Sequence, residues 1–222
     1  MARIADHATV FVVDDDPSVR KGLARLMKSA GYTVETFASA REFLDKEQHQ
    51  SGPSCVVLDV RLPGLSGLDL QQELKRYAFA PSVIFITGHG DVPTSVRAMK
   101  DGAVDFLTKP VNDRDLLRAV EQAVVRNAES RTRQSELLEL QRRADTLTSR
   151  EREVMALVVR GFLNKQVAVV LGTVEKTIKV HRARVIEKMQ VESLAELVRA
   201  AEKLGMFSRQ PDSRTVRPNA ST

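Results

Sequence analysis

Five short apolar runs recur along the first 125 residues, and segments with helical apolar spacing separate them. The runs are Val10–Val13, Thr33–Phe37, Cys55–Leu58, Val83–Ile86 and Val104–Leu107. Between the first two, apolar residues recur about every 3.6 positions, as expected for a helix packed on one face. Five such repeats, with strands that are almost wholly hydrophobic, predict a parallel sheet covered on both faces. The expected fold class is therefore an α/β doubly wound, five-stranded parallel sheet.

The apolar content also limits the classes of protein to which the chain can belong. Its longest uninterrupted apolar run is Val154–Val159, whereas a transmembrane helix needs about 20 such residues. The first ten residues contain Asp6 and no apolar stretch of signal-peptide length. The single cysteine, Cys55, lies in an apolar run, which indicates a buried, reduced thiol. We expect a cytoplasmic protein without a membrane partner.

Charge is distributed unevenly along the chain. Residues 1–125 carry a net charge of −2 and residues 126–222 a net charge of +7. Any polyanionic partner is therefore expected to bind the C-terminal part, although many solvated surfaces are also basic.

Polar residues follow the predicted strands where each strand ends. The first ends in Asp14, Asp15 and Asp16, the third in Asp59 and the fourth in Thr87, and Lys109 follows the fifth. Ligands of parallel sheets bind beyond these carboxyl ends. Clustered carboxylates repel one another, and a hard cation such as Mg²⁺ resolves that conflict. Any one of these acids alone is more simply a solvated turn residue; the whole set favours a site.

The strings FVVDDD, VVLDVRLPGLSG and FITGHGDVPTSVRAMKDGAVDFLTKP resemble, in this order, the receiver domain of two-component response regulators over about residues 8–125. The resemblance implies that Asp59 is the phosphoacceptor and that Thr87 and Lys109 contact the phosphoryl group. It implies that Phe106 is the aromatic switch residue and that the Lys109–Pro110 peptide is cis. It further implies a Mg²⁺ site formed by Asp14, Asp15, Asp59 and the backbone carbonyl of Arg61.

Residues 126–146 are predicted to form a helical linker, because no Gly or Pro interrupts the pattern from Asp113 to Gly161. Leu137, Leu140, Ala144 and Leu147 follow at nearly heptad spacing. Two alternatives are about equal: the helix pairs with a second subunit, or its leucines pack on the domain that follows.

The C-terminal third is predicted to contain four helices, from Thr148 to about Arg160, Asn164 to Leu171, Val174 to Met189, and Ser193 to near Gly205. The short turn Gly172–Thr173 between the second and third suggests a helix-turn-helix. Ile178, Val185 and Met189 share the expected core face of the third helix. Another face of this helix is basic and contains Lys176, Lys179, Val180, Ala183 and Arg184. Its small apolar side chains would allow it to approach the base edges of DNA. The alternative is an exposed face whose Lys and Arg serve solubility.

The string from Leu147 to Gly205 resembles the LuxR/NarL-type DNA-binding domain, and together with the receiver it resembles FixJ-type regulators. The resemblance implies that Lys179, Val180 and Ala183 face the major groove. Thr177, His181, Arg184 and Lys165 are then expected to contact phosphates, with the alternative for His181 of a core-edge histidine hydrogen-bonded to backbone. Val174 stands where the family usually has Ser, so we expect a helix without a side-chain cap. The expected domains are a receiver (1–125), the linker (126–146) and a DNA-binding domain (147–207). Residues 208–222 are polar, contain two Pro and lack apolar periodicity, so a disordered tail is expected there.

The function that follows is that of a response regulator, not an enzyme. Phosphotransfer from a sensor histidine kinase to Asp59 is expected to switch homodimerisation and sequence-specific binding of promoter DNA, with RNA polymerase as a further partner. One alternative is an aspartate-based phosphotransferase of the haloacid-dehalogenase type, but such enzymes need Asp at position 61, which is Arg. Another is a regulator that has lost DNA binding and acts through protein partners.

Overall fold

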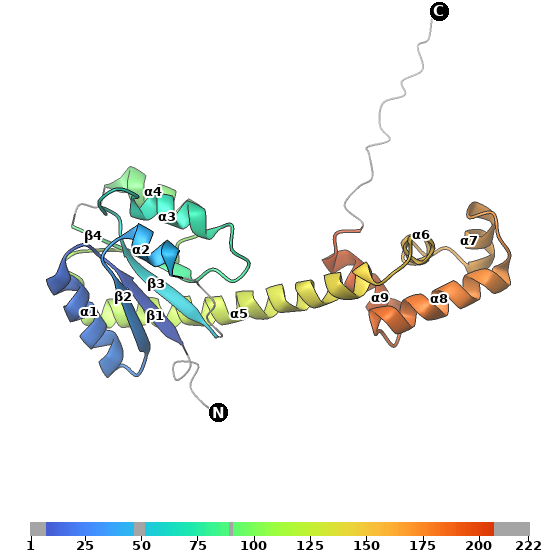
Figure 1. Cartoon of the computed structure of the whole chain (residues 1–222), viewed down its shortest axis with the longest axis horizontal. Coiled ribbons are helices and arrows are strands. Elements are labelled where there is room, and N and C mark those ends of the chain that lie inside the picture. Colours follow the sequence, from blue (N-terminus) through green and yellow to red (C-terminus); the bar gives the residue numbers. More distant parts are fainter. Residues whose placement is uncertain (1–7, 47–51, 89–90, 207–222) are drawn as a thin grey trace, which may run out of the picture. The chain divides into compact units, whose positions relative to one another are not determined.

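The computed structural model describes residues 8–46, 52–88 and 91–206, and the chain divides into two compact units, residues 1–134 and 135–222 (Figure 1). Each unit is described by itself below. None of the helices in these ranges is long and apolar enough to cross a membrane. The tail predicted for residues 208–222 lies outside the described residues.

The first unit is a five-stranded sheet flanked by helices, which confirms the predicted fold class. All strand pairs are parallel, in the order β2-β1-β3-β4-β5. In chain order the elements are β1 (Thr9–Val13), α1 (Pro17–Ser29), β2 (Thr33–Phe37), α2 (Ala40–Asp45), β3 (Ser54–Asp59), α3 (Gly67–Leu74), β4 (Ser82–Thr87), α4 (Val92–Lys100), β5 (Asp105–Thr108) and the start of α5 (Asp113–Asp145).

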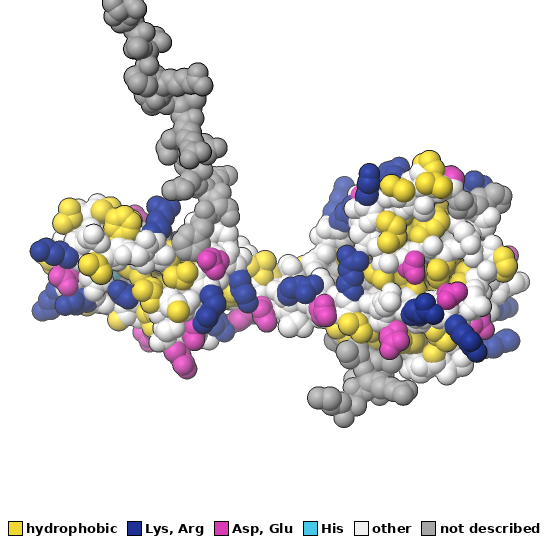
Figure 2. All heavy atoms as spheres, turned by 180° about the vertical axis from the view of Figure 1, so that it is seen from behind, with side chains coloured by type: hydrophobic (Ala, Val, Ile, Leu, Met, Phe, Trp, Pro, Cys, Tyr) yellow, Lys and Arg dark blue, Asp and Glu magenta, His cyan; other side chains and the backbone are white. Residues whose placement is uncertain are grey.

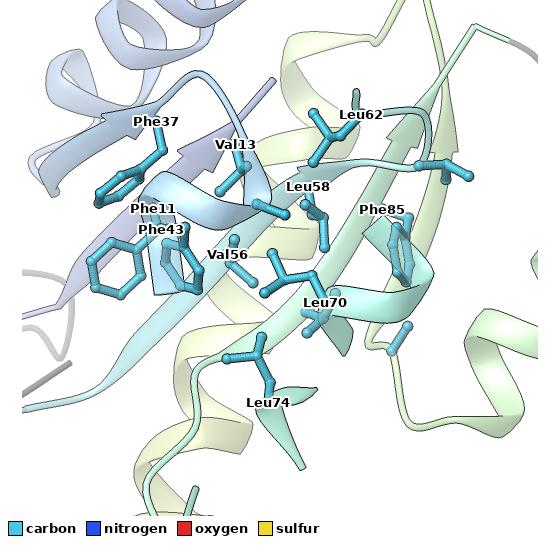
Figure 3. Close-up of a cluster of buried hydrophobic side chains, with 14 of the residues drawn as sticks. Phe11, Val13, Phe37, Phe43, Val56, Leu58, Leu62, Leu70, Leu74 and Phe85 are labelled. Atoms are coloured by element: carbon cyan, nitrogen blue, oxygen red, sulfur yellow. The ribbon is translucent and has the colours of Figure 1, made fainter. Parts of the chain in front are cut away.

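The sheet is buried on both faces, which is why its strands are continuously hydrophobic. Successive side chains of a strand point to opposite faces. Phe11 and Val13 of β1 therefore join the core shown in Figure 3, whereas Val10 and Val12 join the core on the other face. In the first core Phe43 packs edge-on against Phe37, with ring centroids 5.1 Å apart. Edge strands β2 and β5 depart from the pattern, since most residues of β2 and all residues of β5 are partly or fully exposed.

The second unit contains the C-terminal end of α5 and four further helices. These are α6 (Ser149–Val158), α7 (Asn164–Val170), α8 (Glu175–Met189) and α9 (Leu194–Lys203). Their boundaries agree with the prediction to within two residues, including α9, which ends two residues before Gly205. Thr148 and Glu151 form the predicted capping box of α6.

The end of α5 is part of the core of this second unit. Leu147 is buried there, and Leu140 and Ala144 pack against the same cluster. Lys203 Nζ also lies 2.7 Å from Glu136 Oε2. This packing favours the alternative in which the near-heptad leucines pack on the following domain, because side chains buried there are not available to a second helix.

Candidate functional site

The polar residues predicted at the strand ends do come together at one edge of the sheet. Asp14 directly follows β1, Asp59 and Thr87 end β3 and β4, and Lys109 directly follows β5. Lys109 Nζ lies 2.7 Å from Asp14 Oδ2 and 2.6 Å from Asp59 Oδ2. Thr87 is fully buried and follows Ile86, which is the register partner of Asp59. The Lys109–Pro110 peptide is cis.

Three carboxylates of this edge can offer oxygen atoms to one cation. Ligand atoms of Asp14, Asp15 and Asp59 lie within 4.8 Å of one another; Asp14 and Asp59 are buried, whereas Asp15 is exposed. Burial raises the pKa of the Asp14 carboxyl, although Lys109 opposes that effect. Burial also acts to lower the pKa of Lys109, but Asp14 and Asp59 outweigh it and raise that pKa. One ammonium leaves three carboxylates incompletely neutralised, so the donor set fits a hard divalent cation.

Arg20 holds the acidic loop in place, and sequence reasoning missed it. Its Nη1 donates to the backbone carbonyls of Asp14 at 2.6 Å and Asp15 at 3.0 Å. The Asp16 side chain accepts from the backbone N–H of Ser18 at 2.7 Å and so caps α1. The only signal in the sequence was an arginine one turn after the acidic run.

Gly67 allows α3 to begin directly against the backbone of Asp59. A Cβ at position 67 would lie 2.2 Å from the carbonyl oxygen of Asp59. The Asp59 side chain is fixed in turn, because its Oδ1 accepts from the backbone N–H of Arg61 at 2.9 Å. The string LPGLSG contains this glycine, but nothing in its local pattern connects it with Asp59.

Replacing Gly67 with Ala is expected to destabilise the first unit by about 1 to 3 kcal/mol, because backbone must move to admit the methyl group. Urea unfolding followed by circular dichroism measures the change. Gly22→Ala is the matched control, since no atom lies within 4 Å of a Cβ built there. Equal stability of the two variants would contradict the close approach.

Phe106 packs on the side of the sheet that α3 and α4 cover. It is partly buried, and its ring centroid lies 6.0 Å from that of Phe85. Nearby helix α4 exposes three apolar side chains, Val92, Val96 and Met99. A change in the burial of Phe106 would therefore alter the surface that α4 presents.

Helices α7 and α8, joined by a short turn, form the predicted helix-turn-helix. Ile178, Val185 and Met189 of α8 are buried, as predicted. Five predicted contact residues of α8 are exposed, together with Lys165 of α7: Lys176, Lys179, Val180, Ala183 and Arg184. Thr177 and His181 are partly buried. On the face drawn in Figure 2, acidic and basic side chains are interspersed over both units.

Three details of α8 qualify the predicted interface. Val174 precedes the helix and makes no side-chain cap, as predicted. Lys179 Nζ lies 3.3 Å from Glu175 Oε1, so this pair must open before Lys179 can reach a base. His181 Nδ1 is buried and has no hydrogen-bond partner among the described residues, so a role for this side chain would have to use Nε2.

A buried ion pair joins the start of α6 to the end of α8. Lys188 Nζ lies 2.6 Å from Glu151 Oε2 and also donates to the carbonyl of Thr146 at 3.0 Å. Glu151 is 2% exposed, and the hydrogen bond from Lys188, with that from the Thr148 backbone, lowers its pKa to about 2. Sequence reasoning recognised the capping box but not Lys188, because the partners are 37 residues apart.

Comparisons with known proteins cover both units. Residues 10–121 match the response regulator receiver domain family, and residues 145–201 match the bacterial regulatory proteins of the luxR family. Nodulation protein W of Bradyrhizobium diazoefficiens is 49% identical, over 94% of this chain and 92% of that protein. Transcriptional regulatory protein FixJ of Azorhizobium caulinodans is 44% identical, over 89% and 93%.

Solved structures agree with these matches. A low-resolution structure of response regulator StyR has a TM-score of 0.75 and 47% identity, covering 89% of this chain and 99% of that one. Full-length FixJ from B. japonicum has a TM-score of 0.52 and 42% identity, covering 89% and 97%.

Proposed function

Since this chain belongs to the two-component transcriptional response regulators that join a receiver domain to a LuxR-type DNA-binding domain, we propose that phosphorylation of Asp59 controls its binding to DNA. The observation that supports this most directly is the ammonium of Lys109, which bridges the carboxylates of Asp14 and Asp59. A nucleophilic carboxylate, a neutralising cation and a buried hydroxyl are then in reach of one phosphoryl group.

The residues of this edge can carry out phosphoryl transfer by simple displacement. A carboxylate oxygen of Asp59 attacks the phosphorus of a phosphohistidine on a sensor kinase, the new P–O bond forms as the P–N bond breaks, and the histidine leaves. Lys109 neutralises charge on the equatorial oxygens. The product is a mixed anhydride, whose hydrolysis ends the signal. While the phosphoryl group is attached to Asp59, the Thr87 hydroxyl contacts its oxygens, and Phe106 fills the space that Thr87 leaves.

Asp14, Asp15, Asp59 and the carbonyl of Arg61 would hold Mg²⁺ in this scheme. When bound, the cation supplies further neutralisation of the phosphoryl oxygens. The chain's own contribution is to fix the positions of the carboxylates. Arg20 donates to the backbone of the acidic loop, and Gly67 lets α3 lie against the backbone of Asp59.

An apolar groove beside this edge is suited to the kinase. Its volume is about 610 Å³, and it lies between α1 and the loop after β5. The lining includes Val19, Leu23, Leu26 and Val111 together with Lys109 itself. A helix of the kinase that seats its apolar face here would bring its phosphohistidine near Asp59.

The exposed apolar residues of α4 support phosphorylation-dependent dimerisation. Val92, Val96 and Met99 form a stripe that water covers in the single chain. A switch from 1% to 99% populated needs about 5.5 kcal/mol of differential stabilisation. Contacts to the phosphoryl group and burial of this stripe in a homodimer would together supply that stabilisation.

In the second unit α8 would enter the major groove. We assign base contacts to Lys179, Val180 and Ala183, and phosphate contacts to Lys165, Lys176, Thr177, His181 and Arg184. The domain boundaries at residues 125, 146 and 207, cytoplasmic location and contact with RNA polymerase belong to the same proposal.

An electrophoretic mobility shift with promoter DNA tests this function. With acetyl phosphate and Mg²⁺, the protein is expected to bind its promoter more tightly than without. With about four to six phosphate contacts per subunit, log affinity should fall with log salt at a slope of about −0.9 per contact. Binding that is absent in both conditions would indicate a regulator acting through protein partners. Release of phosphate from many small phosphate esters would instead indicate an aspartate-based phosphatase or phosphotransferase.

Lys179→Ala and Arg184→Ala are expected to affect DNA binding differently. Loss of a base contact should lower affinity for the specific site by about 1 to 3 kcal/mol and leave affinity for random DNA nearly unchanged. Loss of a phosphate contact should weaken binding to both DNAs alike. Competition titrations with specific and random duplexes measure the two effects. Equal losses on both DNAs for Lys179→Ala would remove its assignment as a base contact.

A further inference from the structure

Apolar burial does little to hold helix α4 in the receiver. Of its nine residues, only Ala98 is buried. Val92 is 74% exposed, and Val96 and Met99 are each 44% exposed. A helix with so little buried surface is held by a few specific contacts, so the places where they occur decide how it can move.

Among the residues that the structure describes, those contacts gather at the C-terminal end of α4. The carbonyl oxygen of Ala98 accepts from Gln71 Nε2 of α3 at 3.1 Å. Just beyond the helix, Asp101 pairs at 2.7 Å with Lys75, the residue that directly follows α3. At the N-terminal end the Asp91 side chain caps its own helix by accepting from Thr94, and these hydrogen bonds, with a smaller attraction from Arg61, lower its pKa.

Gln71 is an unusual residue for its position. Its side chain is 3% exposed and belongs to the buried face of α3, beside Leu70 and Leu74. Its Oε1 has no partner among the described residues. Buried amide groups are normally satisfied, and an apolar side chain would fill the position without leaving an acceptor unsatisfied. The hydrogen bond to Ala98 is what the glutamine adds.

Helix α3, which carries Gln71, begins beside the proposed phosphoacceptor Asp59. Gly67, its first residue, lies against the carbonyl of Asp59, and Gln71 follows about one turn later. Helix α3 therefore runs from the backbone of Asp59 to the last turn of α4. Gln71 also borders a pocket of about 190 Å³ with Asp101 and Asn127, so this end of α4 is not packed solidly.

We propose that Gln71 is a positioning residue, which fixes the C-terminal end of α4 to α3 so that the helix pivots about that end when the receiver switches. In the stripe of Val92, Val96 and Met99, Val92 at the N-terminal end of α4 would then move most, whereas Met99 near the C-terminal end would keep its position. This pivot rests on the proposed function for its switching role, whereas the anchoring contact itself does not.

Amide hydrogen exchange in the full chain tests the anchor. In the unphosphorylated protein, the amides of residues 99–103 should exchange at least about tenfold more slowly than those of 94–97. Gln71→Met keeps the side-chain volume but removes the donor, and it should abolish that difference. With acetyl phosphate and Mg²⁺, exchange should change at 94–97 alone in the natural protein and along all of α4 in the variant. Gln122→Met, at an exposed glutamine of α5, is the matched control.

Either of two results would overturn the proposal. One is an unchanged exchange profile of α4 in Gln71→Met; the other is faster exchange throughout β1–β5, which would mean general destabilisation. If Gln71→Met does not fold, Gln71→Asn gives the same comparison, because its shorter side chain cannot reach Ala98. A natural protein that takes up no phosphoryl group would refute the proposed function, yet the unphosphorylated comparison would still decide the role of Gln71.

Discussion

Asp59→Asn is expected to accept no phosphoryl group from acetyl phosphate, with labelling reduced by at least about 100-fold. An amide oxygen is a far weaker nucleophile than a carboxylate, and the substitution also removes one of the two buried charges that Lys109 bridges. Incubation with ³²P-labelled acetyl phosphate and Mg²⁺, followed by gel autoradiography, measures the loss. The gain in DNA affinity on phosphorylation should disappear with it.

Asp45→Asn is the matched control for this experiment. Asp45 ends α2, and its exposed side chain pairs, among the residues that the structure describes, with Arg41 alone, so labelling should equal that of the natural protein. Normal labelling of Asp59→Asn would refute the assignment of the phosphoacceptor. Loss of labelling in both variants would show that the effect does not belong to Asp59.

Glu151→Gln is expected to lower the free energy of unfolding of the second unit by roughly 2 to 3 kcal/mol at pH 7. Glutamine keeps the shape and can still accept from the Thr148 backbone, but it leaves Lys188 without its ionic partner beside a buried position. Urea titration followed by the amide signals of α6 and α8 measures the change. Glu153→Gln, which removes only an exposed pair with Arg150, is the control and should have little effect.

The same pair makes the stability of this unit depend on pH in a defined direction. The pKa of Glu151 is about 2 in the folded chain, against an ordinary value of 4.5. Because the folded pKa is depressed, the contribution is fully present above pH 4.5 and is lost as the pH falls from 4.5 toward 2. The difference between the natural protein and Glu151→Gln should therefore shrink over that interval. A difference that stays constant from pH 6 to pH 3 would contradict the lowered pKa.

The connector shows why some features could not be predicted from the sequence. Leu140, Ala144 and Leu147 have a spacing that suits a coiled coil and a packed domain equally, because both bury one stripe of a helix. Only the position of the C-terminal core shows which surface covers them. Lys179 is a different case: its pair with Glu175 joins residues four apart on one helix, a spacing that can be recognised in the sequence.

The sequence by itself determined the sheet, its parallel order of β–α repeats and the residues at the strand ends. Continuous apolar runs in the strands and helical spacing between them are local properties, and parallel strands necessarily bring their carboxyl ends to one edge. The tertiary structure alone decided what supports that edge and the helices around it. Arg20 under the acidic loop, Gly67 against Asp59, Gln71 on Ala98 and Lys188 on Glu151 are contacts set by close packing, to which local sequence patterns give no guide.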